Sequence, residues 1–183
     1  MNREEALELV KQNIKNQNLF KHVLAVEAIM KELAKRFGED EELWGLVGLL
    51  HDLDYEKTMD EPMKHGLLTA EMLKGKVPEE VLNAIRSHNH EYTGFKPQTR
   101  MDKALIAADA ISGLIVACAL VMPDKKLSSV KVKTVKKKFK QKDFARRVNR
   151  ENIRMCEEIG LSLEEFFELA LKALQRISDE LDL

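Results

Sequence analysis

Histidines and aspartates are the residues of this sequence best suited to chemistry. All five histidines lie in the first 90 of the 183 residues: His22, His51, His65, His88 and His90. Imidazole nitrogen together with carboxylate oxygen suits divalent transition metals such as iron, manganese, cobalt, nickel and zinc, whereas calcium and magnesium prefer shells of oxygen alone. The clustering therefore predicts a site for one or two divalent transition-metal ions.

Two aspartates extend this set. Asp52 directly follows His51 at the end of the apolar run EELWGLVGLL. Adjacent residues on a helix point about 100° apart, but at a helix end both side chains can reach an ion that lies off the axis, and the two oxygens of one carboxylate can bridge two ions. Asp109 lies inside the apolar segment LIAADAI, where an ionised carboxylate is costly unless it is paired or coordinated. We expect metal coordination to account for both.

The elements that position these residues are predicted to be helices. Glycine and proline are few, aromatic residues are scarce, and apolar residues recur at three- and four-residue spacing. The fold class is therefore all-α. The expected helices cover residues 3–13, 19–37, 41–50 with Asp40 as the cap, 60–74, 79 to about 90, and 101–122. The histidines can then converge from four helices on one spot, as in helix-bundle metal sites.

The apolar stretch of residues 104–122 is long enough to raise the question of a membrane span. Asp109 in its middle argues against one, since a central carboxylate costs about 2.5 to 3.5 kcal/mol in a bilayer. We expect a buried helix and no membrane partner. The net charge of -1 favours neither nucleic acid nor an acidic membrane. Cys118 and Cys156 are far apart and no cleavable signal pattern is present, so we expect a cytoplasmic location.

The last third of the chain differs in composition. Residues 123–142 are rich in lysine, which predicts the solvated face of a helix capped by Ser128 or Ser129, with attraction of an anionic substrate or nucleic acid as the alternative. From Asn149 onward, apolar and acidic residues alternate as two amphipathic helices, the second capped by Ser162. We expect one domain, with a core over about residues 17–122 and a C-terminal helical extension over about 123–183.

The metal-binding residue types follow a recognisable order. His22, the His51-Asp52 doublet and Asp109 resemble the H...HD...D pattern of the HD superfamily of metal-dependent phosphohydrolases. The segments KHGLLTAEML and IRSH look like its histidine-rich branch, which holds two metals and includes HD-type diadenosine tetraphosphate hydrolases and, more distantly, cyclic-dinucleotide phosphodiesterases and inositol oxygenase. The resemblance covers roughly residues 17–122. HNHEYTGFKP only faintly echoes the GYP-containing segment of the cyclic-dinucleotide enzymes, which disfavours that activity.

The resemblance implies a ligand set. The ligands of the first metal would be His22, His51, Asp52 and Asp109. Asp52 would bridge to a second metal held by His65 and His88. His90 is open: it can complete the second site, contact substrate or replace His88.

The resemblance also implies an activity. We expect an enzyme, a phosphohydrolase in which a metal-activated water attacks a phosphoester or phosphoanhydride of a small substrate, a nucleotide on family grounds rather than a nucleic acid. Asp52, His90, Lys57 and Asp54 are the expected catalytic residues. For Asp54 a hydrogen bond that supports a ligand, or a cap of the loop, is the alternative, and for Lys57 an exposed position. A di-iron oxygenase on the same ligands and a non-catalytic, metal-stabilised nucleotide-binding module remain alternatives, and an oligomer is compatible with all three.

Overall fold

Signals in the sequence fix where the long helices begin. Asn2 and Glu5 form a capping box before α1, Asp40 accepts a hydrogen bond from the Leu43 amide at the start of α3, and Thr99 and Asp102 form a capping box before α8. Gly38, with a φ of +69°, ends α2 in the left-handed conformation that glycine adopts without a steric penalty.

The computed structural model describes residues 1–183, and all of its regular elements are helical, so the all-α prediction is confirmed. The elements are α1 (Arg3–Asn13), α2 (Gln17–Phe37), α3 (Glu41–Leu50), α4 (Tyr55–Thr58), η1 (Pro62–Lys64), α5 (Leu67–Leu73), α6 (Glu79–His88), α7 (His90–Thr93), α8 (Arg100–Leu120), η2 (Leu127–Ser129), α9 (Val132–Lys140), α10 (Arg150–Glu158), α11 (Leu163–Arg176) and α12 (Ser178–Leu181).

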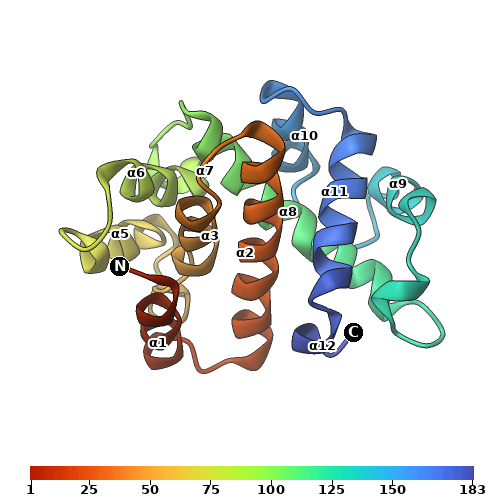
Figure 1. Cartoon of the computed structure of the whole chain (residues 1–183), viewed down its shortest axis with the longest axis horizontal. Coiled ribbons are helices and arrows are strands. Elements are labelled where there is room, and N and C mark those ends of the chain that lie inside the picture. Colours follow the sequence, from red (N-terminus) through yellow and green to blue (C-terminus); the bar gives the residue numbers. More distant parts are fainter.

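Helices α2 and α8 lie at the centre of the bundle (Figure 1). α2 packs against α3, α8 and α11, while α8 also packs against α6 and α10. Gly48 allows α3 to approach α2 closely, because a Cβ atom at this position would lie 2.8 Å from both the Val26 carbonyl oxygen and the Glu27 amide nitrogen. This contact sets the relative positions of His22, one turn before Val26, and His51, one turn after Gly48.

Helix α8 is long and apolar enough to cross a membrane by length and composition alone, with a mean hydropathy of 1.9, and 61% of its most apolar window is buried inside the protein. It packs against α2, α6 and α10. The protein itself covers the larger part of its apolar surface, as expected of a core helix.

Two local predictions are wrong. The helix expected over residues 60–74 is interrupted between η1 and α5, where Gly66 has a φ of +87°. A Cβ at Gly66 would lie 2.8 Å from the Ile85 carbonyl oxygen, so the break accommodates close packing on α6. Neither Ser128 nor Ser129 caps a helix: both lie in η2, and α9 begins after Lys131 without a side-chain cap.

The C-terminal extension is packed into the same core as the rest of the chain. α10 lies on α8, α11 lies on α2, and Ser162 caps α11 as predicted. A short helix, α12, follows and also packs against α2. One apolar cluster of 47 buried residues runs from Ala6 to Leu181. The buried Phe139, Phe166 and Phe167 are the largest side chains that the extension contributes to it.

Candidate metal centre

Four long helices and the break after η1 bring the predicted ligands to one place. His22 comes from α2, His51 and Asp52 from the C-terminal end of α3, and Asp109 from the middle of α8; His65 lies at the break and His88 ends α6. Asp52 is at the centre. Its Oδ1 lies 3.4 Å from His51 Nε2, 3.2 Å from His65 Nε2 and 3.5 Å from His88 Nε2.

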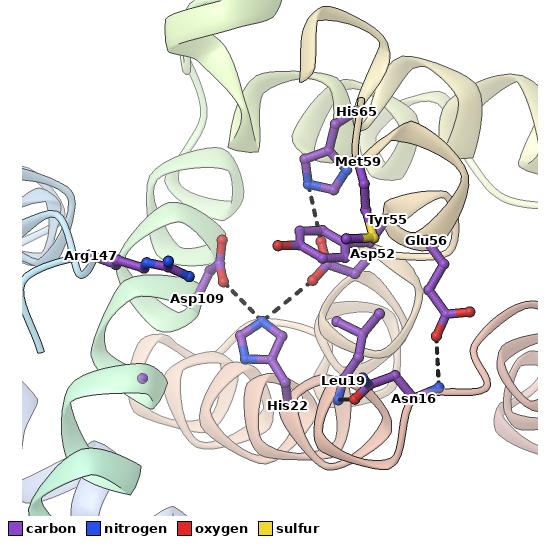
Figure 2. A pocket seen from close by; sticks show the side chains of 11 residues that line it. Asn16, Leu19, His22, Asp52, Tyr55, Glu56, Met59, His65, Asp109 and Arg147 are labelled. Atoms are coloured by element: carbon purple, nitrogen blue, oxygen red, sulfur yellow. Dashed lines mark hydrogen bonds and ion pairs between the residues drawn. The ribbon is translucent and has the colours of Figure 1, made fainter. Parts of the chain in front are cut away.

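The other carboxylate oxygens face the remaining histidine. Asp52 Oδ2 lies 3.5 Å from His22 Nε2, and Asp109 Oδ1 lies 3.0 Å from the same nitrogen. Asp109 Oδ1 is also 3.8 Å from His51 Nε2. Figure 2 shows His22 between Asp52 and Asp109, with His65 on the far side of Asp52. Asp52 thus offers one oxygen to each half of the cluster.

The four imidazoles are held in one orientation by their other ring nitrogens. Nδ1 of His51 lies 2.7 Å from the Gly48 carbonyl oxygen, and Nδ1 of His88 lies 2.5 Å from that of Ile85. These oxygens only accept hydrogen bonds, so each Nδ1 carries a proton and each Nε2 is the nitrogen that faces the cluster. Such hydrogen bonds typically fix the tautomer of metal-ligating histidines.

His22 and His65 follow the same rule. Nδ1 of His65 donates to Asp54 Oδ1 at 2.7 Å. Nδ1 of His22 lies 3.2 Å from Ser112 Oγ, whose own proton goes to the Asp109 carbonyl oxygen at 2.8 Å. The Ser112 oxygen therefore accepts from His22. All four Nε2 atoms point toward the carboxylates of Asp52 and Asp109.

The donor set fits metal ions. His51 Nε2 is buried and has no hydrogen-bond partner, which is costly for a polar atom inside a protein. Nε2 of His65 lies 3.1 Å from Nε2 of His88, so the two nitrogens can share at most one proton between them. Atoms bound to one ion at about 2.1 Å lie roughly 3 to 3.5 Å apart, so a cation satisfies both features.

Two overlapping groups have ligand atoms within 4.8 Å of one another: His22, His51 and Asp109 form one, and His51, Asp52 and His88 form the other. His65 adjoins the second group through its contacts with Asp52 and His88. His51 therefore belongs to both groups in this geometry.

The charges at the site reinforce one another. Burial of the His51 imidazole lowers its pKa, but the charges of Asp52 and Asp109 outweigh burial and raise it to about 9. Burial likewise lowers the pKa of His65, and Asp52 and Asp54 raise it to about 10. Burial raises the pKa of the Asp52 carboxyl, yet the facing imidazoles hold it well below its usual range. The carboxylates of Asp52 and Asp109 therefore stabilise positive charge at this centre.

Asp54 supports His65 and does not face the centre. Its side chain is fully buried, with Oδ1 on His65 and Oδ2 accepting from the amides of Gly66 and Thr69, both at 2.8 Å. Burial raises the pKa of this carboxyl, but His65 and these amides outweigh it and lower the pKa. The position corrects the expected catalytic role of Asp54: it orients a histidine.

Lys57 and His90 also lie away from the centre. The Lys57 ammonium donates to Asn13 Oδ1 at 2.7 Å on the surface. His90 begins α7, and its buried Nδ1 has no hydrogen-bond partner. Neither residue lines the cavity beside the cluster. The roles expected of Lys57 and His90 stay predictions.

A cavity of about 550 Å³ opens onto the cluster. His22, Asp52, His65 and Asp109 line it, whereas His51 and His88 are buried beneath. The lining residues that sequence reasoning missed are Asn16, Leu19, Tyr55, Glu56, Met59, Gly113 and Arg147 (Figure 2). Tyr55, Glu56 and Met59 follow the HD doublet within two turns, a proximity that could have indicated them; nothing in the sequence indicates Arg147.

The comparisons with known proteins agree with this geometry. The family model of the HD domain matches residues 19–114, which is more than half of the chain. The chain therefore belongs to the HD domain family, whose members are in general metal-dependent phosphohydrolases. The matched segment contains every proposed metal ligand and ends before the lysine-rich region.

The curated relatives include two proteins named Ribonuclease Y. The one from Acholeplasma laidlawii is 33% identical over 99 residues, covering 52% of this chain and 18% of its own length. The one from Protochlamydia amoebophila is 36% identical over 97 residues, with the same two coverages. The chain thus spans about a fifth of the length of these relatives. No solved structure matches it significantly.

Proposed function

We propose that this protein is a metal-dependent phosphohydrolase that acts on a phosphoester or phosphoanhydride of a nucleotide. The observation that carries the proposal is the position of Asp52, which presents one oxygen to His51, His65 and His88 and the other to His22, at the floor of an open cavity. Such an arrangement suits two ions that share one carboxylate. A divalent ion bound there supplies Lewis acidity, which activates water and stabilises charge on phosphoryl oxygens.

The chain's own residues supply binding and orientation. His22 and Asp109 form one wall of the cavity and His65 part of another. Ser112 and Asp54 keep His22 and His65 turned toward Asp52. Tyr55 and Met59 give the cavity an apolar edge, which restricts water around a bound phosphate. No side chain is required as a nucleophile in this scheme.

Two observations support a nucleotide as the substrate. A second hollow of about 460 Å³ shares His22 and Gly113 with the first cavity and is lined by Val116, Leu120 and Leu181, so it can receive the less polar part of a substrate whose phosphate lies at Asp52. The relatives named Ribonuclease Y support chemistry on nucleotide phosphates. We propose a small nucleotide substrate, as in the HD-type diadenosine tetraphosphate hydrolases.

The test combines metal content with turnover. We would purify the protein without chelators, determine its metals by elemental analysis, and measure phosphate release from a panel of nucleotides. We expect about two transition-metal ions per chain and phosphate release, both strongly reduced in Asp52→Ala. Lys57→Ala is the matched control, because Lys57 is exposed and bonds only Asn13; it should retain full activity.

Three outcomes would contradict the proposal. Absence of bound metal, even after manganese or iron is added, would remove the site. Activity that disappears without oxygen would indicate the di-iron oxygenase, because hydrolysis needs no oxidant. Tight nucleotide binding without any turnover would indicate a binding module.

A further inference from the structure

One side chain from the C-terminal extension reaches the cavity. Arg147 lies in the loop of residues 141–149, between α9 and α10, and lines the cavity together with His22, Asp52 and Asp109. Figure 2 shows its guanidinium pointing toward Asp109 from the side opposite Tyr55. We propose that Arg147 forms a phosphate-binding subsite that the C-terminal extension adds to the metal centre. This inference rests on the proposed function.

The loop that carries Arg147 is fixed from within. The five N–H groups of the Arg150 guanidinium lie within hydrogen-bond distance of six main-chain carbonyl oxygens, so at least one N–H is shared; these oxygens are those of Lys138, Phe139, Gln141, Phe144, Ala145 and Val148. One side chain thus satisfies four carbonyl groups of the loop, which has no regular structure, and two more at the end of α9. The loop has a defined shape, and Arg147 has a defined place in it.

The same loop is docked beside the metal centre. A Cβ at Gly113 would lie 3.2 Å from Val148 Cγ2, so the small residue at this position lets the loop pack on α8 one turn after Asp109. On its other side, Asn149 Nδ2 donates to Glu91 Oε1 at 2.8 Å, and the Asn149 side chain caps α10. These contacts hold the two residues that follow Arg147, which places its guanidinium at the cavity.

Arg147 has no structural partner of its own. Its exposed guanidinium forms no hydrogen bond or ion pair with the chain, whereas Arg150 uses every donor position on carbonyls. A planar guanidinium matches two phosphate oxygens at once. The donors of Arg147 are therefore free for a ligand, and the ligand chemistry that suits them beside a metal centre is a phosphate group.

The neighbouring Arg146 provides a matched control. It lines a separate cleft with Lys140, Lys142 and Arg154, and not the cavity of the metal centre. Removing its charge changes the overall electrostatic attraction of anions as much as removing that of Arg147. Only a local subsite distinguishes the two positions.

The test measures binding of inorganic phosphate to the manganese-loaded protein by titration calorimetry. We expect Arg147→Gln to raise the dissociation constant about tenfold or more, since a hydrogen bond to a charged group contributes about that much. Arg147→Lys should recover part of the affinity, and Arg146→Gln should stay within about twofold of the wild type. Arg147→Gln removes no internal contact, so its melting temperature should not change.

Several results would overturn the subsite: wild-type protein that binds no phosphate, Arg147→Gln that binds as tightly as wild type, or Arg146→Gln that loses as much as Arg147→Gln. Turnover of nucleotides, measured separately, tests the proposed function. Phosphate binding that depends on Arg147 without turnover would support the subsite and reject the hydrolase. Turnover of nucleotides together with phosphate binding that does not depend on Arg147 would support the hydrolase and reject the subsite.

A second variant tests the role of the loop. Arg150→Met leaves Arg147 in the chain but removes the hydrogen bonds that shape the loop. We expect weaker phosphate binding, as in Arg147→Gln, together with faster tryptic cleavage after residues 146 and 147. If the loop of Arg150→Met is cleaved faster but phosphate binds as tightly as in the wild type, the ordered position of Arg147 is not the source of the affinity for phosphate.

Discussion

At the scale of single residues, Asp52 explains why histidine and aspartate stand together at the end of α3. Its neighbour His51 is fully buried and reaches Asp109 as well as Asp52, whereas Asp52 reaches histidines from three other parts of the chain. A monodentate ligand could not replace a carboxylate in this position. The doublet therefore combines one ligand directed into the core with one directed across the site.

Asp54→Asn should weaken metal binding without unfolding the protein. An amide cannot supply the charge that keeps the proton on Nδ1 of His65, so the Nε2 lone pair would no longer be held toward Asp52. Loss of such a supporting group typically costs about 10- to 100-fold in metal affinity. Competition with a metal indicator would measure the change in metal affinity. Asp60→Asn, on the exposed turn nearby, should bind metal as wild type does; equal affinity in both variants would contradict the role of Asp54.

The two cysteines should be inert in the folded protein. Burial raises the pKa of the Cys118 thiol to about 11 and that of Cys156 to about 12. Only the thiolate reacts, and a raised pKa leaves almost none at pH 8. We expect no reaction with an aromatic disulfide reagent at pH 8 in the native protein, and two thiols per chain after denaturation. Rapid modification of native protein would show that these positions open to solvent.

At the scale of elements, the crossing of α2 and α3 is sensitive to one methyl group. Gly48→Ala would place a Cβ at 2.8 Å from main-chain atoms of Val26 and Glu27, which cannot move without separating the helices. We expect a loss of about 1 to 3 kcal/mol of unfolding free energy and weaker metal binding, because His22 and His51 would move apart. Denaturant unfolding and metal titration measure the two effects.

Gly45→Ala is the control in the same helix. The three atoms nearest to its Cβ would be Lys31 side-chain carbons, the closest at 2.5 Å, and a flexible lysine can move aside. Replacing a helical glycine by alanine otherwise stabilises a helix by roughly 0.5 to 1 kcal/mol. A Gly48→Ala variant as stable as Gly45→Ala would contradict the close crossing of α2 and α3.

The sequence predicts the long elements of this fold and misses features that depend on tertiary contacts. Caps such as Asp40 and Ser162, and the stop at Gly38, are local signals, and the structure has the corresponding helices. The break at Gly66 depends on the proximity of Ile85, which no local pattern records. For the same reason, sequence alone predicted which residue types could gather at one site but assigned Asp54 to catalysis, because its partners only become neighbours on folding.

The position of Arg147 shows the same limit more strongly. It lies 38 residues after Asp109 in the sequence and five residues beyond the lysine-rich segment of residues 123–142, whose lysines predict only a solvated or anion-attracting surface. Its place at the cavity depends on the hydrogen bonds of Arg150 and on the packing of Val148 against Gly113. Neither contact has a signature in spacing or periodicity.

At the scale of the whole molecule, the family segment and the C-terminal extension share one core. α11 covers α2, and α10 covers α8, the two helices that carry His22 and Asp109. Figure 1 shows α9 to α12 along one side of these helices, from end to end. The extension therefore supports the helices that hold the metal centre, in addition to supplying Arg147.

A chain that ends at residue 122 should fail to fold. It would expose the surfaces now covered by Ile153, Phe166, Phe167, Leu171 and Leu174, all buried. Burial of each such side chain contributes about 1.5 to 3 kcal/mol, and together they approach the whole stability of a typical domain, about 5 to 15 kcal/mol. We expect aggregation or a loss of cooperative thermal unfolding. Size-exclusion chromatography would detect the first and circular dichroism the second.

A chain that ends at residue 177 is the control for this truncation. It loses only α12, with the buried Leu181 and the ion pair between Lys21 and Asp182, so it should stay folded with a lower melting temperature. Metal binding by the truncated chains tests the same point at the site, since the separation of His22 and Asp109 depends on how α2 packs against α8. If the chain of residues 1–122 unfolds cooperatively and binds metal as the full chain does, the family segment is an independent domain and the extension only an addition to it.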